Sequence, residues 1–164
     1  MKGEVKPIPD EYRTLTPALT VRNAAEAIEF YKEAFGAQER ERMTTPDGKY
    51  VVHAELKIGD SIFMLGEEMP GMDHRSPQSL GGASVGFYVY VEDVDAAFER
   101  ATAAGATVKA PVENMFWGDR VGTVLDPSGH VWMLATHVED VDPEEMRQRS
   151  QEAMEKMMQG AERP

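Results

Sequence analysis

The chain of 164 residues contains no cysteine, which excludes a disulfide framework and a thiolate metal site. It is also poor in positive charge, because 17 Lys and Arg face 29 Asp and Glu and the formal net charge is −12. An acidic surplus of this size repels a phosphate backbone, so we expect no nucleic-acid partner. The sequence has no apolar run long enough to cross a bilayer and no apolar core of a signal peptide. We therefore expect no membrane partner and a cytoplasmic location.

What the chain does have is an internal repeat. Val21-Arg22-Asn23 opens a helical pattern that ends at Gly36, and Val91-Glu92-Asp93 opens another that ends at Gly105. The segment Ser61-Ile62-Phe63-Met64-Leu65 has its counterpart in His130-Val131-Trp132-Met133-Leu134. Two units are too few for a solenoid, which needs at least three. The repeat therefore predicts two paired modules, each with a half-buried sheet, and a ligand space between the sheets.

Periodicity, caps and turns predict the order βαβββ in each half. The expected strands and helices of the first half are 15–21, 23–36, 39–44, 50–58 and 61–66, and those of the second half are 85–91, 93–105, 106–110, 119–126 and 130–136. The predicted fold class is α+β, with two paired βαβββ modules and a C-terminal helical extension. We expect one domain over 1–141, with a first module at about 13–66, a linker at 67–83 and a second module at about 84–138. A C-terminal helix and tail follow at 142–164.

Three segments outside the repeat have open roles. Residues 1–12 are expected to form a loose arm. The linker 67–83 is either a lid over the pocket or a mobile connection. The helix that begins at Asp142-Pro143 is rich in methionine, so it is either an adaptable contact surface for a partner or a packed terminal helix.

The first hairpin predicts which side chains face the cleft. If Gly59-Asp60 is a two-residue turn, Glu55 pairs with Met64 and Leu56 with Phe63. The face expected to pack under the helices holds Val52, Ala54, Leu56, Phe63 and Leu65. The face expected to line the cleft holds His53, Glu55, Lys57, Ile62 and Met64. A slip of one residue would bury the charged set, so the register is well determined.

The same alternation places Gly86, Tyr88 and Tyr90, and then Met133, Ala135 and His137, on the cleft face of the second module. Strand 119–126 leaves both Asp119 and Arg120 as candidates, because a bulge at Gly129 would shift the pairing by one. Trp117 is either a stacking platform for a planar ligand or a closure of the barrel end. The predicted ligand-binding residues are Tyr88, Tyr90, Trp117, Arg120, Met64, Met133 and His137. We expect them to share one continuous pocket with His53 and Glu55.

The paired modules are familiar from a known family. Together with the segments 21–31, Phe116-Trp117-Gly118-Asp119-Arg120 and Asp126-Pro127-Ser128-Gly129-His130, they resemble the vicinal oxygen chelate superfamily over roughly residues 12–141. That superfamily includes glyoxalase I, bleomycin-resistance proteins, fosfomycin-resistance enzymes and extradiol dioxygenases, and within it the chain looks like the PhnB-like branch. The resemblance implies a homodimer in which modules of two chains complete each other's clefts.

The resemblance also implies where a metal would be held. It places the four ligand positions at Thr16, Met64, Gly86 and Met133, none of which is a usable ligand for a hard or borderline divalent ion. We therefore predict no metal and no cofactor. A displaced site formed by His53, Glu55 and His137 is the alternative, and a metal-free polar cluster is favoured over it.

Two functions of different classes follow. The first is metal-independent binding of a polar or aromatic metabolite or drug. The second is a metal-independent lyase, isomerase or transferase that uses His53 and Glu55 as an acid/base pair, because a carboxylate neighbour raises the pKa of a histidine. A structural ion pair is the alternative for these two residues. The sequence decides neither the ligand nor whether the protein is an enzyme.

Overall fold

The computed structural model describes residues 5–161, so parts of the predicted arm and of the predicted C-terminal tail lie outside the described residues. The first module consists of β1 (Ala18–Val21), α1 (Ala24–Phe35), β2 (Gln38–Thr44), β3 (Val51–Ile58) and β4 (Ser61–Glu67). The second consists of β5 (Gly86–Tyr90), α3 (Val94–Ala103), β6 (Thr107–Asn114), β7 (Asp119–Leu125) and β8 (Val131–His137). The short α2 (Pro77–Leu80) lies between the modules, and α4 (Pro143–Ala161) ends the described chain.

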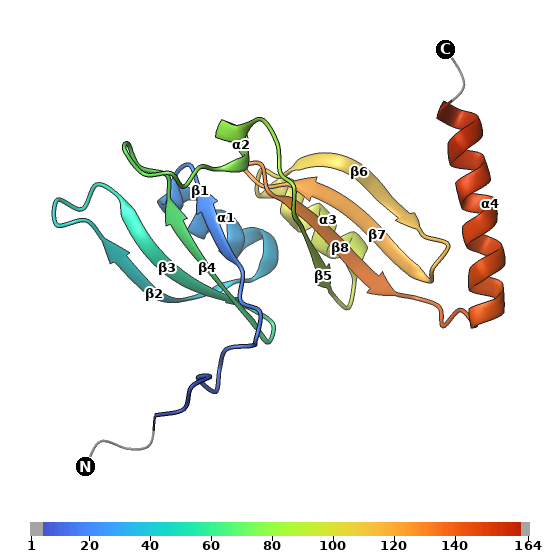
Figure 1. Cartoon of the computed structure of the whole chain (residues 1–164), viewed down its shortest axis with the longest axis horizontal. Helices are drawn as coiled ribbons and strands as arrows, with labels where there is room; N and C mark the ends of the chain where they lie inside the picture. The colour runs from blue at the N-terminus through green and yellow to red at the C-terminus, as the bar shows by residue number, and fades with distance from the viewer. Residues whose placement is uncertain (1–4, 162–164) are drawn as a thin grey trace.

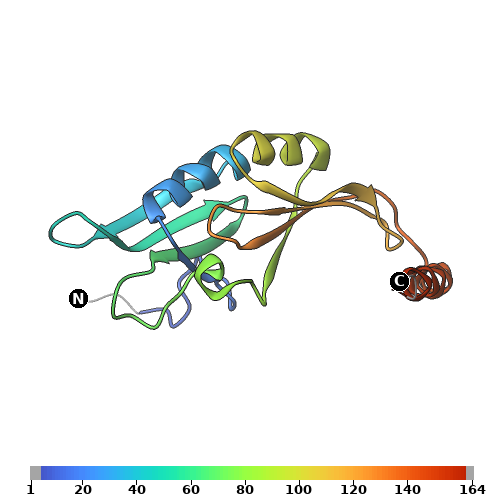
Figure 2. The ribbon, with the colours of Figure 1, turned by 90° about the horizontal axis from the view of Figure 1, so that it is seen from above.

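Each module forms its own four-stranded sheet, with the strand orders β1-β4-β3-β2 and β5-β8-β7-β6 (Figure 1). The first strand of each module runs parallel to the last, and the other neighbours are antiparallel. This is the predicted α+β class with paired βαβββ modules. Helices α1 and α3 lie side by side on one face of the two sheets, while α4 stands apart at the far end (Figure 2). We call the sheet face turned away from α1 and α3 the open face.

Local sequence explains both long module helices. The Asn23 side chain accepts a hydrogen bond from the backbone N–H of Glu26, and Gly36 closes α1 at a φ of 64°. The Asp93 side chain accepts from the N–H of Ala96 at 3.0 Å and caps α3 in the same way. No helix in residues 5–161 is long and apolar enough to span a membrane.

The predicted register of the first hairpin is confirmed. Glu55 pairs with Met64 and Leu56 pairs with Phe63. The buried face holds Ala54, Leu56, Phe63 and Leu65. Val52, which we predicted under the helices, is instead 42% exposed. The pairing of β2 with β3 shifts between Met43 and Thr44, so that Val51 takes the buried position.

The core continues across the two modules through an aromatic cluster. The ring of Trp132 in β8 lies 5.4 Å from Tyr31 and 4.8 Å from Phe35 of α1, and 4.8 Å from Phe87 of β5. The buried carboxylate of Asp126 accepts hydrogen bonds from Tyr31 Oη at 2.6 Å and from Trp132 Nε1 at 3.0 Å. One polar group therefore connects the helix of the first module to the last turn of the second.

The bounds of two strands differ from the prediction, and a proline and irregular strand pairing explain the differences. Strand β1 starts at Ala18, after Pro17, rather than at residue 15. Strand β6 extends to Asn114 and contains shifts in its pairing with β7. The linker is tied down at Ser76, whose N–H donates to Glu68 at 2.8 Å, and at Gln78, whose N–H donates to the Ser128 carbonyl at 3.0 Å.

Candidate ligand-binding site

The open face of the second sheet carries a cluster centred on one buried carboxylate, Asp119. Its side chain lies on β7 opposite His137 of β8 and accepts hydrogen bonds from four side chains. Oδ2 accepts from Tyr88 Oη at 2.9 Å, from Tyr90 Oη at 3.0 Å and from Trp117 Nε1 at 3.2 Å. Oδ1 lies 2.8 Å from His137 Nδ1. We call Tyr88, Tyr90, Trp117, Asp119 and His137 the Asp119 cluster.

Gly118 explains how the loop before β7 reaches this cluster. Its φ is +96°, and a Cβ atom there would lie 2.1 Å from the carbonyl oxygen of Glu139. The Gly118 carbonyl accepts from the N–H groups of Val138 at 2.9 Å and Glu139 at 3.0 Å. Only glycine permits both the positive φ and the close approach, and this contact holds Trp117 beside the end of β8.

The hydrogen bonds set the charges of the cluster. Burial alone would raise the pKa of Asp119, but the bonds from His137, Tyr88, Tyr90 and Trp117 lower that pKa below its usual range. Burial, followed by the bond to Asp119, raises the pKa of Tyr88 to about 12. Bonds to Asp140 and then to Asp119 raise the pKa of His137. The carboxylate is therefore ionised and both tyrosines are protonated at neutral pH.

The structure resolves the choice between Asp119 and Arg120. Gly122 faces α3, because a Cβ atom there would lie 2.6 Å from the Phe98 ring. Since side chains alternate along a strand, Asp119, three residues before Gly122, faces the open side. Arg120, which we predicted to bind ligand, lies on the helix side and bonds Asp95 at 2.7 and 2.8 Å. The length of the turn between β7 and β8 determines which of the two residues faces the open side. Leu125 pairs with Val131 across the five residues 126–130, whereas the first hairpin turns through Gly59 and Asp60 alone.

The open face of the first sheet carries a smaller polar group. His53 Nε2 lies 3.6 Å from Glu55 Oε1, in agreement with the predicted proximity of the two residues. The Tyr12 hydroxyl from the N-terminal segment donates to the same carboxylate oxygen, and Glu11 pairs with Arg40 of β2. Sequence reasoning missed Tyr12, because nothing in the sequence pattern indicates that this residue contacts Glu55 of β3.

Within the described residues 5–161, the predicted set is not brought together in one pocket. His53 and Glu55 lie on the first sheet, whereas His137 lies on the second sheet and Trp117 on the loop that enters β7. Met64 pairs with Glu55 and Met133 with Tyr88, so each methionine lies on the open face of its own sheet, half-buried. The prediction joined the sets because it assumed that the two open faces turn toward each other, whereas the sheets lie edge to edge with β1 and β5 at the centre (Figure 1).

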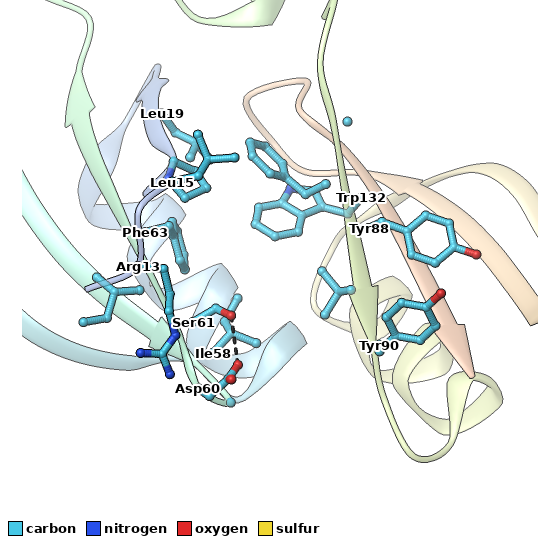
Figure 3. Close-up of a pocket in the computed structure, with 16 residues that line it drawn as sticks. Arg13, Leu15, Leu19, Ile58, Asp60, Ser61, Phe63, Tyr88, Tyr90 and Trp132 are labelled. Carbon is cyan, nitrogen blue, oxygen red and sulfur yellow. Dashed lines mark hydrogen bonds between the residues drawn. The ribbon is translucent and has the colours of Figure 1, made fainter. Parts of the chain in front are cut away.

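A cavity of about 490 Å³ lies at this junction, and two residues of the Asp119 cluster are among those that line it (Figure 3). Its walls are mostly apolar, with Leu15, Leu19, Ile58 and Phe63 on one side and Phe87, Val89 and Trp132 on the other. Tyr88 and Tyr90 complete the second side. A second cavity of about 560 Å³ lies beside it, against α2, and is lined in part by Pro77, Leu80 and His130.

The family's metal positions do not suit a metal ion. Thr16 is half-buried and donates its hydroxyl to the Arg13 carbonyl, Gly86 has no side-chain ligand atom, and Met64 and Met133 offer thioether sulfur. The alternative set is not assembled either, because His137 lies on the second sheet. Within residues 5–161 no group of three or more His, Asp or Glu side chains is arranged to hold a metal. The residues therefore do not fit the ion, and the metal-free state remains a prediction for metal analysis.

The family model described as Glyoxalase/Bleomycin resistance protein/Dioxygenase superfamily matches residues 14–134, and the chain belongs to this family. An uncharacterised protein of Mycobacterium bovis is 46% identical over 136 residues, which are 81% of this chain and 89% of the relative.

Two solved structures show the same fold. TioX from Micromonospora sp. ML1 has a TM-score of 0.58 at 27% identity, with 77% of this chain and 99% of TioX covered. The PhnB protein from Bacillus cereus has a TM-score of 0.59 at 19% identity, with 76% of this chain and 99% of that chain covered. The PhnB-like resemblance is thereby confirmed at the level of fold.

Proposed function

We propose that this protein binds a small polar or aromatic molecule, a metabolite or a drug, at the Asp119 cluster without a metal ion. The observation that carries the proposal is the cluster itself. Tyr88 is 39% exposed and Tyr90 is 64% exposed, yet their hydroxyl groups are held by the same buried carboxylate. Aromatic rings that are both accessible and fixed in position are typical of ligand sites, because little side-chain entropy is lost on binding.

The surroundings support a site of useful size. Tyr88 and Tyr90 also border the 490 Å³ junction cavity, which falls within the range of small-molecule pockets. Figure 3 shows the Tyr88 and Tyr90 rings projecting from β5 away from Leu19 and Phe63, which lie across the cavity. The apolar cavity therefore adjoins β5 and does not enclose the rings.

A second candidate function is catalytic. His53 and Glu55 lie within ion-pair distance, and Tyr12 adds a third titratable group to the same carboxylate. This arrangement supports a metal-independent lyase, isomerase or transferase in which His53 moves a proton. In that case His53→Ala abolishes turnover and leaves ligand affinity nearly unchanged. A turnover rate equal to that of the wild type in this variant would exclude the role.

We also propose a homodimer, in which the open face of one protomer's first sheet meets the second sheet of its partner. The support is the family resemblance, the two open faces, and the exposed Met154, Met157 and Met158 of α4. The predicted continuous pocket would then form between two chains. Sedimentation at micromolar concentration should show a dimer, and a monomer at that concentration would contradict the proposal. The proposal keeps the expected cytoplasmic location, which cell fractionation would test.

Binding to a panel of polar aromatic compounds tests the main proposal. Trp117→Ala should weaken the binding of any hit by about 1–3 kcal/mol, the scale of a lost aromatic contact. Arg120→Gln is the matched control, because Arg120 lies on the same strand as Asp119 but on the helix side. Absence of any hit, or equal affinity in the Trp117 variant, would refute the proposed site. Metal analysis of the purified protein should find no stoichiometric Zn, Ni, Mn or Fe.

A further inference from the structure

The hydrogen-bond directions in the Asp119 cluster determine what the site can offer a ligand. An ionised carboxylate has no proton, so every group bonded to Asp119 must be the donor. Tyr88 and Tyr90 each have one hydroxyl proton, and both protons are directed to Asp119 Oδ2. The two hydroxyl oxygens can therefore only accept a hydrogen bond from a ligand.

Tyr90 is the better placed of these two acceptors. The Tyr88 oxygen already receives a long bond from Trp117 Nε1 at 3.4 Å, whereas no donor to the Tyr90 oxygen is found in residues 5–161. The Tyr90 side chain is also the more exposed of the two. Asp119 itself is only 3% exposed and is already bonded by four donors, so it orients the tyrosines and is not a direct ligand contact.

The tyrosine rings add an attraction for positive charge. The centroids of Tyr88 and Tyr90 are 5.2 Å apart with a tilt of 52°, so the exposed rings form a pair of π faces. A cation placed over the face of such a ring is attracted by the negative potential of the π system. The Trp117 indole N–H is also directed to Asp119, which leaves its ring plane to contact a ligand.

The charged groups around the cluster also favour a ligand with positive charge. His137 is the one member of the Asp119 cluster that can become cationic, and its two ring nitrogens are bonded to Asp119 and to the fully exposed Asp140. Arg149 is engaged by Glu139 and Glu145. The net charge of −12 adds a long-range field that draws cations and repels anions.

We propose that the Asp119 cluster selects organic cations that carry N–H donors, such as an amidinium, a guanidinium or a primary ammonium group on a planar body. The N–H group donates to Tyr90 Oη, and the positive charge lies against the aromatic rings. Asp119 acts as a positioning residue that fixes the tyrosines as acceptors. This inference rests on the proposed binding function and names its ligand class.

Four aromatic probes of similar size test it: benzamidinium, benzyltrimethylammonium, benzamide and benzoate. Calorimetric titration of the wild type should give the tightest binding for benzamidinium, with benzoate at least about 10-fold weaker, because benzoate has no N–H donor for Tyr90 and its negative charge is repelled by the acidic chain. Tyr90→Phe keeps the ring and removes the acceptor. It should weaken benzamidinium about 3- to 10-fold and leave benzyltrimethylammonium, which has no N–H group, unchanged.

Asp119→Asn tests the positioning role. The side-chain amide introduced by this substitution can donate to a tyrosine oxygen and free that hydroxyl proton, so the preference for benzamidinium over benzoate should fall at least about 10-fold. Arg120→Gln should leave the ratio unchanged. Thermal unfolding of each variant verifies that it is folded. If Asp119→Asn does not fold, the result for Tyr90→Phe alone decides the inference.

The outcomes separate the two proposals. Benzoate binding as tightly as benzamidinium, or an Asp119→Asn variant that retains the wild-type ratio, would overturn the cation inference. Binding of compounds from the broad panel but of none of the cationic probes would also overturn it and leave the binding function standing. No binding of any compound would overturn both.

Discussion

The two sheets have equivalent strand orders, but their open faces carry different side chains. Met64 lies beside Ala18 in the first sheet, and Met133 lies beside Tyr88 at the equivalent position of the second. Small residues on β1 therefore stand where β5 carries its exposed tyrosines. The polar centre also moves, from Glu55 in mid-strand to Asp119 at the start of β7.

The partners of the two carboxylates differ in origin. Glu55 is bonded by Tyr12, which belongs to the segment before β1, whereas Asp119 is bonded by residues of its own sheet and of the loop that enters β7. The polar group of the first sheet therefore depends on a segment distant in sequence, whereas the Asp119 cluster uses only its own sheet and the adjoining loop. A repeated fold thus fixes the positions of side chains, while residue size and the connecting segments decide which face can bind a ligand.

The largest effect is expected where the two modules share one core. Asp126→Asn should lower the free energy of unfolding by about 2–3 kcal/mol, because it leaves buried donors without an ionised acceptor. These donors include Tyr31 Oη at 2.6 Å and the N–H of Ser128 at 2.9 Å. Urea denaturation measures the change. A loss below about 1 kcal/mol would mean that the junction does not depend on this group.

Two glycines with positive φ, one in each module, should respond differently to substitution. Gly118→Ala should cost about 1–3 kcal/mol of stability and weaken ligand binding at least about 10-fold, because the Cβ atom would collide with Glu139 and displace Trp117. Gly59→Ala is the matched control in the first hairpin. Gly59 also has a positive φ, of +56°, but nothing lies within 4 Å of its Cβ position. Its variant should lose about 1 kcal/mol and bind normally. Equal binding by both variants would remove the structural role assigned to Gly118.

The coupling of His137 to two carboxylates predicts a pH dependence. In NMR titrations His137 should protonate above its ordinary pKa, and Asp119→Asn should lower that pKa. A histidine pKa that is raised in the folded state contributes stability below the unfolded value of about 6.5 and loses it as pH rises through the folded pKa. The destabilisation caused by His137→Gln should therefore be larger at about pH 6 than at about pH 9. A cost that grows with pH would contradict the assigned contacts.

The smallest effect is expected at the first sheet. Tyr12→Phe should cost less than about 1 kcal/mol, because it removes one hydrogen bond near the surface and preserves the ring. Probe binding at the Asp119 cluster should be unchanged. Reduced binding in this variant would show that the N-terminal segment takes part in the site.

The fold and the facing of most strands followed from the sequence, because alternation over a strand leaves one consistent register. Ala54, Leu56 and Phe63 could be assigned to the buried face in this way, and Tyr88, Tyr90 and His137 to the other. The role of Arg120 could not, since it depends on one residue of turn length between β7 and β8. The placement of Tyr12 and the edge-to-edge arrangement of the modules depend on tertiary contacts, which carry no periodic signal.

The most direct test of the account uses the chain's two tryptophans. Trp117 belongs to the Asp119 cluster, and Trp132 is buried in the junction core, where it also borders the 490 Å³ cavity. Each indole N–H gives its own signal in a ¹H–¹⁵N NMR spectrum, which Trp117→Phe assigns. On titration with benzamidinium, the account predicts that the Trp117 signal shifts with saturation and the Trp132 signal stays in place. A saturable shift of Trp132 with Trp117 unchanged would place the ligand in the junction cavity and contradict the central role of the Asp119 cluster.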